Sequence, residues 1–175
     1  MRDLWQDDSP RDECGVFGIY APGMDVARLT FFALFALQHR GQESAGVAVT
    51  DGSRLIVHKD IGLVSQVFSE ETLQSLPGSL AIGHVRYSTT GANEMRNAQP
   101  FARTRNGSFI ALAHNGNLVN TDQLRADLLR SGQVFASTSD TDVIAALLAE
   151  HPSHDIREAL RDIIREVLQT DAQFS

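Results

Sequence analysis

Short apolar runs alternate along the chain with polar segments that contain glycine, and their spacing predicts both strands and helices. Residues 14–20 form an apolar run that predicts a first strand, which ends at Pro22 and Gly23. Asp25 then stands where a helix N-cap is expected, ahead of apolar residues at helical spacing. Asp51-Gly52 separates two further apolar runs, so the sequence predicts a hairpin there.

The second half of the chain has the same mixed pattern. Strands are expected at 79–87 and 108–113, and a broken helix at 62–76. Three helices should follow. Two of them begin with residues at the spacing of a capping box, Asn120 with Gln123 and Ser139 with Asp142, and Asp155 and Glu158 start the last, amphipathic helix. This order of elements indicates an α+β fold with sheet and helix layers.

Composition narrows the class of protein. The 175 residues suffice for one domain with a substantial core. A net charge of −7 without a Lys/Arg cluster argues against a nucleic-acid partner, and no apolar run is long enough to span a membrane. Cys14 is the only cysteine, so an internal disulfide is impossible, and a cytoplasmic location is expected.

Candidate chemistry lies where polar clusters meet the ends of predicted elements. Cys14 opens the first strand, and the clusters are Arg40-Gly41, residues 86–91, Asn115-Gly116 and Ser139-Asp140. Each has an ordinary structural interpretation when taken alone. A lone cysteine is often buried, Asn-Gly often forms a turn, and an acid in a first helical turn favours the dipole. Their occurrence together is stronger evidence for a functional site than any one of them alone.

Six motifs occur in order, and together they resemble one family. The motifs are CGVFGI (14–19), QHRGQESAG (38–46), GHVRYSTTG (83–91), AQPF (98–101), HNGNL (114–118) and TSDTD (138–142). With these motifs the chain resembles the glutaminase domain of the amidophosphoribosyltransferase family, which belongs to the class II amidotransferases and N-terminal-nucleophile hydrolases. The resemblance implies a four-layer αββα sandwich, which residues 14–175 should supply only in part, ending before the last strands.

The resemblance also implies roles for individual residues. The Cys14 thiol would be the nucleophile and its own α-amino group the base. Asn115 and Gly116 would form the oxyanion hole. Arg86, with Thr89, would hold the glutamine α-carboxylate. Asp140 would pair with the substrate ammonium. Arg40 and Gly41 would belong to the loop that shapes the nucleophile's pocket. His84 and His114 are expected to orient loops rather than bind metal.

A free Cys14 amine requires removal of the residues before it. Residues 1–13 carry five acids and no apolar pattern, which is typical of a disordered leader. The resemblance implies that this leader is a propeptide, cleaved between Glu13 and Cys14. The resemblance implies that ammonia from glutamine reacts with phosphoribosyl pyrophosphate on a further domain, in the first committed step of purine synthesis. It also implies a homo-oligomeric full-length protein.

Cofactors are expected only outside this chain. By resemblance, Mg²⁺ and an iron–sulfur cluster would belong to the C-terminal part of the full-length protein, and no metal site is expected here. Two alternatives stay open: an unprocessed, truncated domain that binds glutamine without catalysis, and another class II amidotransferase of the glucosamine-phosphate synthase type.

Overall fold

Strand β4 is an inner strand of a four-stranded antiparallel sheet in the computed structural model, which describes residues 14–87 and 94–171. The strand order is β1-β4-β2-β3, and each neighbouring pair is antiparallel. The hairpin predicted around Asp51-Gly52 joins β2 to β3 and is confirmed. The strands are β1 (Gly15–Tyr20), β2 (Ser44–Thr50), β3 (Leu55–Ile61) and β4 (Leu80–Arg86).

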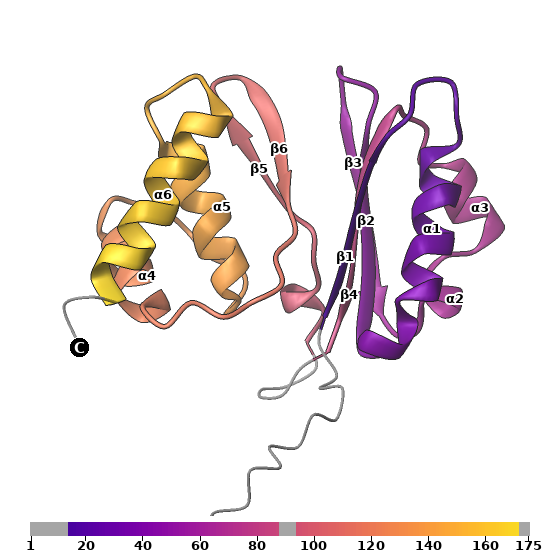
Figure 1. Cartoon of the computed structure of the whole chain (residues 1–175), viewed down its shortest axis with the longest axis horizontal. Coiled ribbons are helices and arrows are strands. Elements are labelled where there is room, and N and C mark those ends of the chain that lie inside the picture. Colours follow the sequence, from indigo (N-terminus) through magenta and orange to yellow (C-terminus); the bar gives the residue numbers. More distant parts are fainter. Residues whose placement is uncertain (1–13, 88–93, 172–175) are drawn as a thin grey trace, which may run out of the picture.

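Three helices cover the outer face of this sheet (Figure 1): α1 (Val26–Ala36), α2 (Val64–Val67) and α3 (Glu70–Gln74). Asp25 caps α1 as predicted, because its side chain accepts a hydrogen bond from the Arg28 backbone N–H at 3.0 Å. Gly83 allows α1 to pack closely on β4. A Cβ at that position would lie 2.6 Å from the Thr30 side chain.

The second half of the chain forms a two-stranded sheet with three helices on its outer side (Figure 1). Two 3₁₀ turns, η1 (Gln38–Arg40) and η2 (Met95–Asn97), precede β2 and β5. The elements of this half are β5 (Phe101–Arg105), β6 (Ser108–Leu112), α4 (Thr121–Arg130), α5 (Asp140–Glu150) and α6 (Ile156–Asp171).

The two sheets face one another, and helices lie on both outer faces (Figure 1). The expected α+β fold with αββα layers is therefore confirmed. Buried apolar residues of the first core come from β2, β4 and α1, including Val47, Val85 and Leu34. No helix among residues 14–87 and 94–171 is both long enough and apolar enough to cross a membrane.

Strand β5 was not predicted, because strands were expected at 79–87 and 108–113 with none between them. Arg103 and Arg105 alternate with smaller residues, so the segment has few apolar positions. Both arginines are nevertheless drawn inward: Arg103 pairs with Asp142 at 2.7 Å, and Arg105 donates to the Leu148 carbonyl at 2.8 Å. This polar segment is therefore stabilised as a strand by contacts with residues that are distant in the sequence.

Both predicted capping boxes are wrong. Asn120 precedes α4 but makes no side-chain cap, and Gln123 donates instead to Asp127. Ser139 does cap α5 by accepting from the Thr141 backbone N–H, but Asp142 binds the Arg103 guanidinium and the Ser137 hydroxyl.

Candidate active site

Cys14 lies directly before β1, beside the C-terminal end of β4. The register sets Gly15 opposite Val85, which brings Cys14 next to Arg86 and Tyr87. The thiol donates to the Tyr87 carbonyl and accepts from the Tyr87 backbone N–H, both at 3.3 Å. Cys14 is half-buried and unpaired. The sulfur is therefore held at the end of the sheet, within reach of an incoming molecule.

A cavity of about 670 Å³ lies beside this thiol. Four of the predicted site residues line it, and they come from four separate parts of the chain: Cys14, Arg86, Gly116 and Asp140. Together they place a nucleophile, a cation, a backbone N–H donor and an anion around one volume. Such a set can hold a zwitterionic amino acid and present its side chain to a thiol.

Arg86 ends β4 and brings a cation to the lining of the cavity. Its Nη1 nitrogen is buried and makes no hydrogen bond to any residue that the structure describes. A buried charged donor without a partner is costly, so the arrangement suits a ligand oxygen. A planar guanidinium can bind both oxygens of a carboxylate.

Asn115 and Gly116 form a turn after β6. The Asn115 side-chain amide donates to the Cys14 backbone carbonyl at 2.5 Å. Gly116 has a φ of +149°, and a Cβ there would lie 2.8 Å from the His114 ring. Glycine is therefore required for both conformation and space. The turn keeps an amide side chain and a backbone N–H close to the nucleophile.

Asp140 is the first residue of α5, and backbone donors fix its carboxylate. One oxygen accepts from the Leu118 N–H at 2.9 Å, and the other from the Thr141 N–H at 2.7 Å. The His114 ring nitrogen Nδ1 lies 4.0 Å away. The helix N-terminus stabilises the negative charge, which faces the cavity.

Arg40 and Gly41 are not among the residues that line this cavity within the described part of the chain. Gly41 packs against the backbone of β4, because a Cβ there would lie 2.7 Å from the Val85 carbonyl carbon. The Glu43 N–H also donates to the Arg86 carbonyl at 3.1 Å. This loop therefore supports the end of β4 from behind. Thr89 lies outside the described residues.

His84 is fully buried on β4, two residues before Arg86 and on the same face of the sheet. Burial lowers its pKa to about 4, against opposing interactions with the Asn115 side chain and the His114 backbone. The imidazole is consequently neutral near pH 7, and it lies under the turn that carries Asn115. The expectation that it orients a loop stays a prediction.

Metal coordination has no support in the part of the chain that the structure describes. Its residues include no cluster of three or more histidine, cysteine, aspartate or glutamate side chains suited to a metal ion. One cysteine cannot ligate an iron–sulfur cluster. No chemical step is therefore assigned to Mg²⁺ or to such a cluster.

Fold and site together define a class. The four-layer sandwich, with a cysteine at the start of its first strand, is that of the N-terminal-nucleophile hydrolases. The family model of the glutamine amidotransferase domain matches residues 69–163. The chain belongs to the glutamine amidotransferase domain family.

Several proteins of known name are similar to this chain. The amidophosphoribosyltransferase of Synechococcus elongatus is 57% identical over 148 residues, covering 84% of this chain and 30% of that protein. The enzyme of the same name from Mycobacterium bovis is 53% identical over 167 residues, covering 91% and 32%. Glutamine phosphoribosylpyrophosphate amidotransferase from B. subtilis, solved with ADP and GMP, is 40% identical with a TM-score of 0.77, covering 86% and 32%. The chain spans about a third of the length of these relatives.

Proposed function

We propose that this domain hydrolyses the side-chain amide of glutamine with Cys14 as nucleophile. The observation that carries the proposal is the single cavity lined by Cys14, Arg86, Gly116 and Asp140. Arg86 binds the α-carboxylate and Asp140 the α-ammonium, so the amide carbon extends toward the Cys14 sulfur. By resemblance, Thr89 assists Arg86.

The chemistry begins with a proton moving from the Cys14 thiol to its own α-amino group. The thiolate attacks the amide carbon, and the carbonyl oxygen becomes an oxyanion that Asn115 and the Gly116 N–H stabilise. The C–N bond then breaks, and the leaving group takes the proton from the α-ammonium and departs as ammonia. Water next attacks the thioester, releases glutamate and returns the proton to sulfur.

This base requires a free amine, because a peptide nitrogen at Cys14 cannot accept the proton. An α-amine titrates at about 7.7–8.0, so its basic form is available near neutral pH. We infer that residues 1–13 are a propeptide that is removed before the enzyme becomes active. The free thiol also suits a reducing cytoplasm.

The acceptor of the ammonia follows from the names of the relatives. In the longer protein, ammonia would displace pyrophosphate from phosphoribosyl pyrophosphate and form phosphoribosylamine. This reaction requires chain outside the residues described here, and we propose it for the full-length protein, together with homo-oligomeric assembly.

The test uses the full-length protein and two nitrogen sources. Wild type should release glutamate from glutamine and form phosphoribosylamine with either glutamine or free ammonia. Cys14→Ser should abolish the glutamine reactions and retain the ammonia reaction. If Cys14→Ser hydrolyses glutamine at the wild-type rate, Cys14 is not the nucleophile; if wild type binds glutamine without releasing glutamate, the domain is a binding module.

A further inference from the structure

Residues 97–100 join η2 to β5, at the junction between the two sheets (Figure 1). Asn97 and Gln99 are each only 6% exposed, and Ala98 and Pro100 are buried with them. Buried side-chain amides must find hydrogen-bond partners or cost free energy. The two amides of this segment bond two different loops that line the cavity, one at His114 and one at Thr138.

Gln99 bonds the backbone of His114 twice. Its Oε1 accepts from the His114 N–H at 2.8 Å, and its Nε2 donates to the His114 carbonyl at 3.2 Å. The side-chain amide therefore pairs with His114 as a neighbouring strand would. His114 directly precedes Asn115 and Gly116, so these two bonds fix the start of the turn that holds the oxyanion donors.

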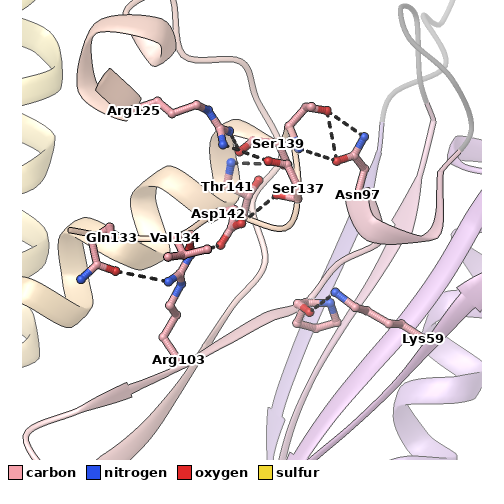
Figure 2. A network of polar contacts seen from close by, with 12 residues as sticks. Lys59, Asn97, Arg103, Arg125, Gln133, Val134, Ser137, Ser139, Thr141 and Asp142 are labelled. Carbon is pink, nitrogen blue, oxygen red and sulfur yellow. Dashed lines mark hydrogen bonds and ion pairs between the residues drawn. The ribbon is translucent and has the colours of Figure 1, made fainter. Parts of the chain in front are cut away.

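The segment itself is anchored to the sheet that carries Cys14. Lys59 of β3 donates from Nζ to the Ala98 carbonyl at 2.5 Å and to the Pro100 carbonyl at 3.0 Å (Figure 2). Gly46 of β2 lets the backbone approach closely, because a Cβ there would lie 2.0 Å from the Gln99 carbonyl oxygen. The sheet thus sets the position of Gln99, and Gln99 sets the position of the turn.

Asn97 makes the matching contacts with a second loop that lines the cavity. Its Oδ1 accepts from the Thr138 N–H at 3.0 Å, and its Nδ2 donates to the Thr138 hydroxyl at 3.0 Å. Figure 2 shows Asn97 reaching to the loop before α5, on which Arg125 also bonds the carbonyls of Ser137 and Ser139 at 2.9 and 2.8 Å. That loop leads directly into Asp140.

We propose that Gln99 and Asn97 are paired positioning residues, Gln99 for the oxyanion hole and Asn97 for the ammonium-binding carboxylate. The assignment rests on the proposed glutamine hydrolysis. Because each amide serves one end of the substrate, the two substitutions have separable effects. Loss of Gln99 acts on the transition state, and loss of Asn97 acts on substrate binding.

Gln99→Glu is the sharper variant, since it keeps the shape and the accepting oxygen but sets a second oxygen against the His114 carbonyl. In the full-length protein, kcat with glutamine should fall roughly tenfold to a hundredfold, because a catalytic group misplaced by about 1 Å costs up to about 10²-fold. KM for glutamine should stay within about twofold of wild type. Gln99→Met, which removes both bonds without adding charge, should behave in the same way and serves if the glutamate variant does not fold.

Asn97→Ala should give the opposite pattern, with KM raised several-fold and kcat nearly unchanged. The matched control is Gln66→Glu: Gln66 is exposed on α2, and its Oε1 accepts from the Leu63 N–H, as a carboxylate also can. All four substitutions, the two at Gln99 included, should leave the ammonia-dependent reaction at the wild-type rate.

A second measurement distinguishes a positioning role of Gln99 and Asn97 from a general effect of the substitutions on protein stability. The γ-aldehyde of glutamate adds to a thiol, and the oxygen of the resulting tetrahedral adduct occupies the oxyanion hole, whereas glutamate binds without forming a tetrahedral adduct. Gln99→Glu should weaken aldehyde inhibition by the factor by which kcat falls and leave glutamate inhibition unchanged; Asn97→Ala should weaken both equally. The proposal would be overturned if both Gln99 variants kept the wild-type kcat and the wild-type aldehyde inhibition. It would also be overturned if the glutamine and ammonia reactions were lost in parallel. Absence of glutamine hydrolysis in wild type and Gln66→Glu would instead refute the proposed function.

Discussion

The Asn115 side chain donates a hydrogen bond to the backbone carbonyl of Cys14, a residue 101 positions earlier in the chain. This bond joins the start of β1 directly to the turn after β6. The side chain expected to stabilise the oxyanion is therefore hydrogen-bonded directly to the residue expected to create it. No other residue is needed to set the spacing between Asn115 and Cys14.

The first prediction concerns the free amine of Cys14. A full-length chain that begins with a removable Met directly before Cys14 should hydrolyse glutamine, because the α-amine is then available as base. A chain that retains residues 1–13 should lack this activity and still use ammonia. Intact mass measured beside the activity assay checks the state of the N-terminus. Active protein that keeps the leader would show that the α-amine is not the base.

Arg86→Lys tests the carboxylate site. A lysine keeps the charge but lacks the planar fork, so KM for glutamine should rise by roughly tenfold or more, while use of ammonia stays intact. Steady-state kinetics with both nitrogen sources measure this. Arg54→Lys, on the exposed hairpin loop, is the control and should match wild type. Equal loss of both reactions in Arg86→Lys would assign Arg86 to folding instead.

Gly116→Ala tests the backbone of the oxyanion turn. The positive φ and the 2.8 Å approach to the His114 ring both oppose a Cβ, so stability and kcat should fall, with a strain of about 1–3 kcal/mol. Gly107→Ala is the matched control, because Gly107 has a φ of +76° but no atom within 4 Å of an added Cβ. Urea unfolding and glutamine turnover measure the difference. Equal effects of the two substitutions would exclude a role for the close contact.

Burial of His84 predicts a pH-dependent stability. The pKa is about 4 in the folded chain and about 6.5 when unfolded, so between these values the unfolded state binds more protons. The free energy of unfolding should therefore fall as the pH drops from about 6.5 to about 4, by about 3 kcal/mol for the whole shift. Hydrogen exchange of β4 amides, corrected for intrinsic rates, measures this loss.

His84→Gln is the comparison for that experiment. It removes the titrating group, so its stability should depend less on pH over the same window, even where its absolute stability is lower. Identical pH slopes for the wild type and the variant would show that His84 is not responsible.

Local signals in the sequence were sufficient for much of the fold. Asp25 marked the start of α1 and Asp51-Gly52 the hairpin, because a cap and a two-residue turn depend on residues within a few positions of one another. The motifs around Cys14, Arg86, Asn115 and Asp140 likewise indicated the class of chemistry, since each carries the required functional group within a short segment.

Tertiary structure alone decided which groups meet. The Phe101–Arg105 segment became a strand because Arg103 and Arg105 found partners some 40 residues away, at Asp142 and Leu148, and no local pattern encodes such pairs. Asp142 does not complete the expected cap of α5, because its carboxylate binds the distant Arg103 guanidinium instead. Gln99 lies in the AQPF motif, but the positioning role proposed for it and for Asn97 could not be predicted locally, since their partners lie on the loops at His114 and Thr138. Hydrogen bonds between distant segments form only when the layers pack, so the sequence determined the functional groups and the packing determined their geometry.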